Sequence, residues 1–378
     1  MAWQFVAEVA KLQLGALQKV RIIMGNESCD LDSAASALAY GYLQNCMANR
    51  NPNIGTVIPI LNIPQEDFIL KTEVCYYLKK CGVPLGNLFF RDTINFDLLM
   101  SSSELGIVLV DHHALSDKDT SLKPYVIEVI DHRPLDPDWQ WENVKKTMET
   151  VGSCATLVAE LLITQNEFPV PEEVLMLLYG TIILDTACLS DNPKKFTAKD
   201  VSVLEEMEKR LVNKPGRGTL YSELLSVRCD ITELSISQLL RKDLKVVSNI
   251  PVSSLPLLVQ DFLSMSDAEE EVERFAESHQ YKAVVILGVS KLGNELKREI
   301  AIFSQERSLL KVLTDSLTKS KTPNLQLQPI KNFSDSGKVV LFRQLNKDAS
   351  RKQIVPLVKQ AVINYERTHS PGCSSTRS

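Results

Sequence analysis

The sequence predicts an α/β protein whose N-terminal domain is built on a parallel β-sheet. Short apolar runs rich in β-branched residues alternate with longer segments of helical character through the first part of the chain, which is the pattern of βαβ units. Runs such as Ile107–Val110 are apolar at every position, as expected of central strands that are buried on both faces. Several of these runs end in Asp or His, at the sheet edge where open α/β folds carry their binding sites.

Each element of the first domain is expected from its local pattern. The expected strands are Val20–Met24, Thr56–Leu61, Leu88–Phe90, Gly106–Val110 and Val126–Ile130. The expected helices are Ala34–Gln44, Ser153–Ile163 and Glu172–Leu184. Residues Met1–Leu17 show helical periodicity and contain Glu8 but no arginine, so we expect a packed first helix and not a mitochondrial transit peptide.

A change in composition indicates where the first domain ends. The segment Asn213–Gly218 is rich in glycine, proline and polar residues, which break regular structure. We expect a first domain at 1–190, a linker at 191–218, a smaller C-terminal α/β domain at 219–366 and a disordered tail at 367–378. The elements expected in the second domain are a helix Leu234–Lys242, a strand region Lys245–Leu255, a helix Asp267–Ser278, a strand Lys282–Val289 and a closing helix Ser350–Tyr365.

The overall composition excludes several classes of protein. The chain has 378 residues, of which 44% are hydrophobic, and a formal net charge of −5. This balance is typical of a globular protein and is unlike that of a general nucleic-acid binder. No apolar run reaches the roughly 20 residues that a membrane helix needs. The eight cysteines are dispersed without a C-x-x-C pair, so we expect a reducing compartment, the cytoplasm first, with the nucleus as an alternative and mitochondria less favoured.

Two carboxylates lie where the first strand gives way to a helix. Asp30 and Asp32 belong to the segment Gly25–Ser33, directly after the apolar run Val20–Met24. Side chains held this close repel each other unless a cation lies between them, and a divalent metal ion is the simplest candidate. The alternative is an ordinary helix start, because Asp and Ser are common N-caps. This stretch alone leaves both interpretations open.

Two further strand ends carry the same kind of residues. Ile107–Val110 is followed by Asp111, His112 and His113, and Val126–Ile130 is followed by Asp131, His132 and Arg133. A later apolar stretch ends in Asp185. Such carboxylates, with a histidine and an asparagine, are enough for a site with two Mg²⁺ or Mn²⁺ ions in which one Asp bridges the pair. Because no thiolate is needed, structural zinc is disfavoured.

The order of these motifs resembles that of the DHH phosphoesterase superfamily, and the second half resembles the DHHA2 domain. Both occur in family II inorganic pyrophosphatases and in prune-type exopolyphosphatases. The details are similar to the prune type: Asn26 stands where pyrophosphatases have a metal-binding His, and Arg133 where the superfamily signature has a second His. The other segments that carry the resemblance are Val151–Thr156, Gly180–Asp185, Leu240–Asp243 and Ser350–Gln353.

The resemblance implies roles for individual residues. It implies two divalent metal ions, Mg²⁺ or Mn²⁺, bound by Asp30, Asp32, Asp111, His132 and Asp185, with Asp111 as the bridge and Asn26 as an additional candidate. It implies phosphate binding by Arg133, Lys242, Arg351 and Lys352, with Arg241 beside them. The expected catalytic residues are Asp111, His112, His113 and Arg133. His113 is expected to contact substrate or donate a proton, and Asp131 to orient His132.

The function implied by the resemblance is that of an exopolyphosphatase. It would hydrolyse the terminal phosphoanhydride of short-chain inorganic polyphosphate by attack of a metal-bound hydroxide, in a cleft between the two domains. The alternatives are a 3′,5′-cyclic-nucleotide phosphodiesterase, a pyrophosphatase, against which Asn26 and Arg133 argue, and a non-catalytic regulatory binding protein. The family also implies a nucleoside diphosphate kinase as a partner. Neither nucleic acid nor a membrane is expected as a partner.

Overall fold

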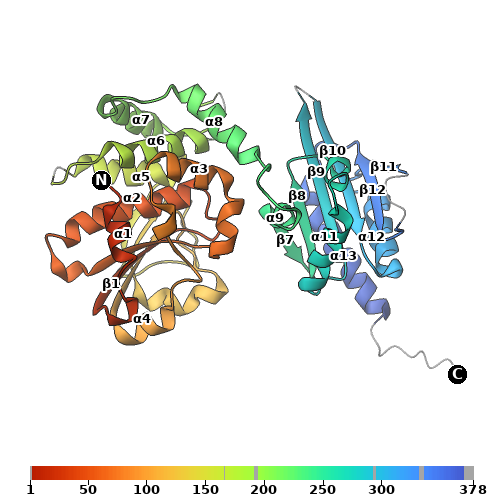
Figure 1. Cartoon of the computed structure of the whole chain (residues 1–378), viewed down its shortest axis with the longest axis horizontal. Helices are drawn as coiled ribbons and strands as arrows, with labels where there is room; N and C mark the ends of the chain where they lie inside the picture. Colours follow the sequence, from red (N-terminus) through yellow and green to blue (C-terminus); the bar gives the residue numbers. More distant parts are fainter. Residues whose placement is uncertain (1, 166, 191–194, 293–294, 332–335, 370–378) are drawn as a thin grey trace. The chain divides into compact units, whose positions relative to one another are not determined.

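The structure is a computed structural model that describes residues 2–165, 167–190, 195–292, 295–331 and 336–369. The chain forms two compact units, Met1–Asp230 and Ile231–Ser378 (Figure 1). Each unit contains one six-stranded sheet among the described residues. No described helix is long and apolar enough to cross a membrane.

The sheet of the first unit is parallel throughout and has the strand order β3-β2-β1-β4-β5-β6. Its strands are β1 (Lys19–Met24), β2 (Thr56–Leu61), β3 (Phe89–Phe90), β4 (Glu104–Val110), β5 (Val126–Asp131) and β6 (Lys145–Met148). The prediction of a parallel sheet is therefore confirmed, and each predicted strand overlaps an observed one. The edge strand β6 was not predicted, because its polar sequence KKTM lacks an apolar run.

The order of the strands determines where a ligand can approach. The chain runs from β1 to β2 and β3 on one side, and then returns to place β4 directly beside β1. The order therefore reverses between β1 and β4, and the crevice outside the carboxyl ends of such strands is the usual binding site of an open α/β sheet. Asp32 follows β1 and Asp111 follows β4, so both lie at this point.

Helices cover the first sheet. They are α1 (Gln4–Val9), α2 (Leu31–Ala48), α3 (Thr72–Lys80), α4 (Phe96–Ser102), α5 (Cys154–Thr164), α6 (Glu172–Asp185), α7 (Ala198–Arg210) and α8 (Arg217–Cys229). The short 3-10 helices are η1 (Leu14–Ala16), η2 (Pro52–Ile54), η3 (Gln65–Leu70), η4 (Leu85–Asn87) and η5 (Asp117–Tyr125). One apolar core joins a face of the sheet to α2, α5 and α6, and a second joins the other face to α4 and η5. Helix α2 is buried along almost all its length, which fits its alanine-rich sequence.

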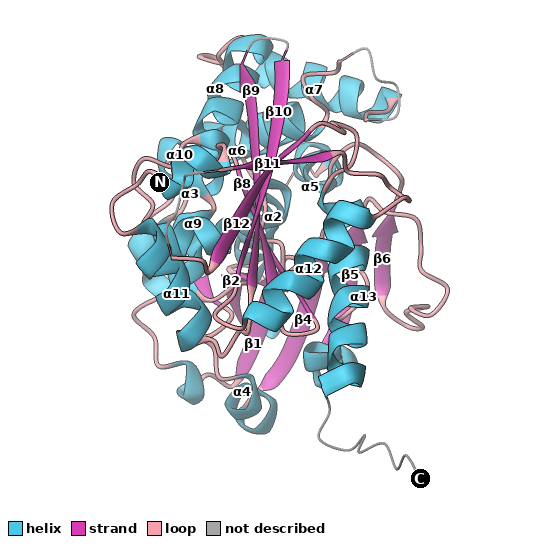
Figure 2. Ribbon diagram, turned by 90° about the vertical axis from the view of Figure 1, so that its right-hand side faces the viewer, coloured by secondary structure: helices cyan, strands magenta, loops and turns pink. Residues whose placement is uncertain are grey.

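The second unit is a smaller α/β structure with a mixed sheet of order β11-β12-β10-β9-β8-β7. Its strands are β7 (Leu244–Val247), β8 (Ile250–Leu255), β9 (Val284–Leu292), β10 (Glu295–Phe303), β11 (Leu327–Ile330) and β12 (Val339–Gln344). Its helices are α9 (Ile236–Lys242), α10 (Val259–Leu263), α11 (Ala268–Ser278), α12 (Arg307–Lys319) and α13 (Arg351–His369). Helices α12 and α13 lie side by side (Figure 2) and share an apolar core with β8, β9 and β10.

The second unit and the domain boundary also differ from the expectation. The strand region Lys245–Leu255 is two antiparallel strands, β7 and β8. The segment expected as a linker, 191–218, contains α7, which packs on α5 and α6, and the two units divide only after Asp230. Of the expected tail 367–378, helix α13 includes the first residues, and 370–378 lie outside the described part of the chain, as do 191–194.

Candidate active site

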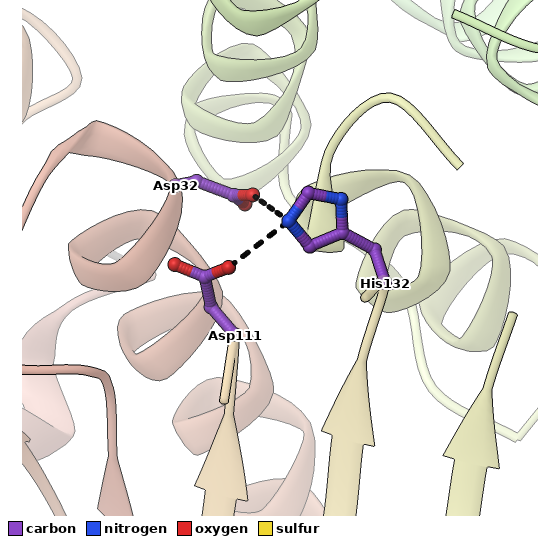
Figure 3. A group of neighbouring side chains, drawn as sticks. All are labelled: Asp32, Asp111 and His132. Carbon is purple, nitrogen blue, oxygen red and sulfur yellow. Dashed lines mark ion pairs between the residues drawn. The ribbon is translucent and has the colours of Figure 1, made fainter. Parts of the chain in front are cut away.

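Three side chains meet at the carboxyl ends of the central strands. Asp32 lies in the first turn of α2 after β1, Asp111 directly follows β4, and His132 directly follows β5. Figure 3 shows the imidazole of His132 facing both carboxylates. Its Nε2 lies 3.3 Å from Asp111 Oδ1 and 3.9 Å from Asp32 Oδ2. One oxygen from each carboxylate and this nitrogen are close enough together to hold one metal ion.

Backbone donors hold Asp32. Its Oδ2 accepts from the Cys154 N–H at 2.7 Å, and its Oδ1 accepts from the Ala155 N–H at 2.7 Å. The carboxylate therefore lies against the first residues of α5, where free N–H groups stabilise negative charge. Burial nevertheless raises the pKa of Asp32, and Asp30 adds to this, whereas His132 opposes it.

Asp111 is the residue in which the need for a cation is clearest. It is 1% exposed and has a left-handed backbone with φ of 60°. Its Oδ2 accepts from the side-chain amide of Asn26 at 2.7 Å, but its buried Oδ1 accepts no hydrogen bond from the described residues. Burial and the charge of Asp32 raise the pKa of Asp111 to about 7. A buried, partly unpaired carboxylate oxygen fits a metal ligand, because a divalent cation would satisfy it.

His132 is oriented as a metal-binding histidine would be. Its Nδ1 lies 2.9 Å from the Val151 carbonyl, which can only accept. The proton of the neutral ring is therefore on Nδ1, and Nε2 presents a lone pair towards the two carboxylates. Burial alone would lower the pKa of His132, but Asp111 and Asp32 raise it to about 9. A bound cation would take the place of the second proton, which the charged ring carries on Nε2.

The two other predicted acidic ligands lie around these three side chains. Asp30 is the N-cap of α2: its Oδ1 accepts from the Ser33 N–H at 3.1 Å, and its Oδ2 from Ser28 Oγ at 3.2 Å. Asp185 ends α6, and its Oδ2 accepts from Ser153 Oγ at 2.8 Å. The pKa of Asp185 is raised well above its usual value, by burial first and then by Asp32 and Asp30. This mutual repulsion shows that the carboxylates share one region of charge.

The side-chain oxygen and nitrogen of Asn26 have different partners. Its Oδ1 accepts from the Ser28 N–H at 2.9 Å, and this donor identifies the oxygen side of the amide. The amide nitrogen therefore faces Asp111 and donates to its carboxylate and to its carbonyl oxygen, at 3.2 Å for the latter. In this arrangement Asn26 is a donor to an expected ligand, and its own oxygen is directed elsewhere.

The two histidines after Asp111 are held by protein atoms. His112 is buried, and its Nδ1 lies 3.0 Å from the Val110 carbonyl; burial lowers the pKa of its ring. His113 contacts Asp131 Oδ2 through Nδ1 at 2.5 Å and accepts the Asp136 N–H on Nε2 at 2.9 Å. Both ring nitrogens of His113 are thus occupied, so a role in proton transfer would need a rearrangement. Such a role stays a prediction.

Asp131 and Arg133 lie in the same turn as His132. Asp131 Oδ1 accepts from the His132 N–H at 2.7 Å and from the Arg133 N–H at 3.2 Å. The carboxylate therefore shapes the turn that carries both residues. The guanidinium of Arg133 is 51% exposed and lies 3.6 Å from Asp111 Oδ1. A half-exposed arginine beside buried acids can bind an anion from solvent.

The two predicted anion-binding motifs of the second unit are in contact through Arg351 and Asp243. Arg351, at the start of α13, pairs with Asp243 Oδ1 at 2.7 Å and donates to the Asp243 carbonyl at 2.6 Å. Asp243 directly follows Lys242 at the end of α9, and Lys352 is exposed beside Arg351. Two motifs that are far apart in the sequence are therefore joined by one ion pair within this unit.

Sequence reasoning missed the groups that support the three central side chains. Cys154 and Ala155 act through backbone N–H groups, which any residue other than proline has, so their residue types do not indicate the role. Asp200 is fully buried, and the sequence analysis did not identify it as a site residue. The available signal was the Thr197–Asp200 spacing of a capping box, which predicts a helix start and nothing more.

This combination of sheet, strand-end acids and second unit corresponds to a known class. Residues 21–182 match the profile described as the DHH family, N-terminal domain, and residues 222–361 match the DHHA2 domain. The chain is 32% identical over 358 residues to the exopolyphosphatase PRUNE1 of Homo sapiens, covering 93% of this chain and 78% of the relative. The chain therefore belongs to the DHH–DHHA2 family of phosphoanhydride hydrolases that includes PRUNE1.

More distant relatives agree with this assignment. A manganese-dependent inorganic pyrophosphatase of Methanothrix thermoacetophila is 22% identical over 274 residues, covering 70% of this chain and 79% of the relative. Among solved structures, a Methanococcus jannaschii protein assigned to the family II inorganic pyrophosphatases matches with a TM-score of 0.50 and 20% identity. That match covers 90% of this chain and 99% of the other, and it supports the fold.

Proposed function

We propose that this protein is a metal-dependent exopolyphosphatase that hydrolyses the terminal phosphoanhydride of short-chain inorganic polyphosphate. The observation that carries the proposal is the group Asp32, Asp111 and His132, with a buried oxygen of Asp111 that lacks a hydrogen-bond partner among the described residues. The similarity to PRUNE1, which is named an exopolyphosphatase, supports the substrate class.

Two divalent ions would be held by Asp30, Asp32, Asp111, His132 and Asp185. When bound, such ions make a coordinated water more acidic and supply positive charge to the phosphoryl oxygens. Asp111 would be the ligand that the two ions share, as the family resemblance implies; its Oδ1 faces His132 Nε2 and accepts no hydrogen bond from the described residues. Val151 and the N–H groups of Cys154 and Ala155 hold His132 and Asp32 in the orientation that binding needs.

The basic residues would bind the substrate. Arg133 lies beside Asp111 and is open to solvent, so its planar fork would grip two oxygens of the terminal phosphate. Lys242, Arg351 and Lys352 of the second unit would neutralise the remaining chain. For Arg351 this requires phosphate to displace Asp243, with which it is paired. Charge at these positions would stabilise the transition state of phosphoryl transfer.

The preferred metal would depend on Asn26. The names of two archaeal relatives include manganese dependence. Here an amide, Asn26, stands where the family resemblance implies a histidine in the pyrophosphatases, and the amide donates to Asp111. Losing an imidazole ligand weakens selection for Mn²⁺ over the harder Mg²⁺. We therefore propose activity with Mg²⁺ as well as Mn²⁺.

The deciding experiment compares three substrates. Phosphate release would be measured from tripolyphosphate and pyrophosphate, and formation of 5′-AMP from cyclic AMP, each with Mg²⁺ or Mn²⁺, for the wild type, Asp111→Ala and Asp111→Asn. We expect tripolyphosphate to be the best substrate and both variants to be inactive. Inert tripolyphosphate alongside rapid turnover of cyclic AMP would favour the phosphodiesterase alternative. Full activity of the variants would refute the assigned site.

A non-catalytic regulatory protein is the second candidate. The side chains that would bind metal are all present, which favours an enzyme, and metal binding without turnover of any of the three substrates would favour the regulator. A cytoplasmic location and a nucleoside diphosphate kinase partner are further proposals, and they rest on the family resemblance alone.

A further inference from the structure

The segment Val151–Ala155 contacts three of the five expected metal ligands. The Val151 carbonyl lies 2.9 Å from His132 Nδ1, and Ser153 Oγ donates to Asp185 at 2.8 Å. The N–H groups of Cys154 and Ala155 each donate to Asp32 at 2.7 Å. A shift of this segment would therefore move an imidazole and two carboxylates together.

One buried side chain, Asp200 of helix α7, holds this segment. Asp200 is 0% exposed. Its two oxygens accept from the Gly152 N–H at 3.1 and 2.9 Å, and Oδ1 also accepts from Thr156 Oγ1 at 2.6 Å. The donors lie on either side of Ser153, so the carboxylate spans the turn that leads into α5. Hydrogen bonds to such a buried carboxylate are strong and directional.

The backbone around Gly152 is packed closely against the same region. A Cβ at this position would lie 2.7 Å from the Lys195 carbonyl oxygen and 2.8 Å from Thr186 Cγ2. The turn can therefore lie this close to Lys195 and Thr186 only because residue 152 has no side chain. The segment is fixed from both sides.

Helix capping does not account for all the contacts of Asp200. As the third residue of α7 it accepts from the Thr197 N–H at 2.7 Å and from Thr197 Oγ1 at 2.9 Å, which completes a capping box. A cap needs only these local donors. The bonds to Gly152 and Thr156 reach a different part of the chain, and they connect α7 to the site.

We propose that Asp200 is a positioning residue that sets the affinity of the site for divalent metal ions by holding the Val151–Ala155 segment. The proposal rests on the proposed metal-dependent function. Asp200 contacts neither substrate nor metal. It acts through Gly152 and Thr156 on the groups that orient Asp32, His132 and Asp185.

The test measures Mn²⁺ affinity by calorimetry and by electron paramagnetic resonance of the full chain. Asp200→Asn keeps the shape but turns an N–H₂ group towards donors, so we expect Mn²⁺ to bind about 10–100-fold more weakly, with a changed resonance line shape. Thr156→Val removes a single donor and should weaken binding about threefold to tenfold. Thr181→Val is the matched control: among the described residues, the hydroxyl of this buried threonine donates to the Leu177 carbonyl of its own helix α6.

The outcomes separate this proposal from the proposed function. Weaker Mn²⁺ binding in Asp200→Asn and Thr156→Val, but not in Thr181→Val, supports the positioning role, even if tripolyphosphate is not hydrolysed. Wild-type affinity in a folded Asp200→Asn overturns it, even if the wild type is an active exopolyphosphatase. If thermal unfolding in EDTA shows that Asp200→Asn does not fold, Thr156→Val decides: affinity equal to that of Thr181→Val overturns the proposal.

Discussion

At the scale of single residues, Arg133 is the cation best placed to act on a phosphate near the acidic group. Its side chain is half exposed, and it lies 3.6 Å from an oxygen of Asp111. It lies between the buried acids and solvent, where the proposed function has it bind the terminal phosphate. The planar fork can bind two oxygens, which a lysine at the same position cannot do.

Arg133→Lys should therefore lower kcat for tripolyphosphate by at least about tenfold, because a bidentate contact to the phosphoryl group is lost. Steady-state kinetics with Mg²⁺ would check this. Arg228→Lys is the control, since Arg228 has similar exposure but pairs with Glu73. Equal rates for the wild type and Arg133→Lys would remove Arg133 from the mechanism.

Asn26→Asp should destabilise the metal-free protein by about 1–3 kcal/mol, because it replaces the donor 2.7 Å from Asp111 with a second carboxylate. Chemical denaturation in EDTA gives this value, and saturating Mn²⁺ should restore most of it. Asn95→Asp is the control, because it makes the same change at the N-cap of α4, where Asp caps equally well. Its free energy of unfolding should equal that of the wild type. Equal effects at both positions would contradict the role given to Asn26.

At the scale of elements, the sequence predicted the central strands better than the surrounding helices. Strands β1, β2, β4 and β5 are continuous apolar runs, and this pattern depends only on burial on both faces. Helix α7 lies inside the segment expected as a linker, because that expectation rests on the breaks near residue 191 and at Asn213–Gly218 and not on the residues between them. Its packing on α5 and α6 depends on tertiary contacts that local pattern does not report.

The difference between local sequence pattern and tertiary contacts also explains which site residues could be predicted. Asp32, Asp111 and His132 follow apolar strands, so their approach to one another follows from the parallel sheet. The separate contacts of Asn26 could not be foreseen, because they depend on the course of the loop between residues 25 and 30. The pairing of Arg351 with Asp243 joins distant helices, and spacing alone does not indicate it.

The start of α2 allows the two interpretations of Asp30 to be separated. Asp30 caps the helix by accepting from the Ser33 N–H, and it is also an expected metal ligand. Asp30→Asn retains the cap, so metal-free stability should change by less than about 0.5 kcal/mol, whereas Mn²⁺ affinity should fall about tenfold. Asp30→Ala should lose a further ~1 kcal/mol of stability. Denaturation and calorimetry on both variants measure the two effects, and unchanged affinity in Asp30→Asn would leave only the cap.

At the scale of the whole molecule, the metal-free protein should become less stable as pH rises. The fold raises the pKa of Asp111 from 3.8 to about 7 and that of His132 from 6.5 to about 9. The folded state therefore binds protons that the unfolded chain releases. The free energy of unfolding that these two bound protons contribute is fully present at low pH. The contribution of Asp111 is lost between about pH 4 and 7, and that of His132 between about pH 6.5 and 9.

Asp111→Asn should consequently be more stable than the wild type in EDTA at pH 8, by on the order of 2 kcal/mol, because it removes a buried charge near Asp32. With saturating Mn²⁺ the order should reverse, since only the wild type binds the ion tightly. Thermal unfolding at pH 5 and pH 8, with and without Mn²⁺, tests both parts. A wild type that is the more stable of the two in EDTA at pH 8 would contradict the repulsion inferred here.

The left-handed backbone of Asp111 has a consequence for how this protein can change over evolutionary time. Glycine, asparagine and aspartate adopt a φ of 60° more readily than most residues, so most other replacements would strain the turn as well as remove the carboxylate. Aspartate is connected to asparagine and to glycine by single-nucleotide changes. A lineage that gave up catalysis could therefore keep this fold by either of these two replacements, and a relative with Asn or Gly here would be a candidate for a retained, inactive descendant.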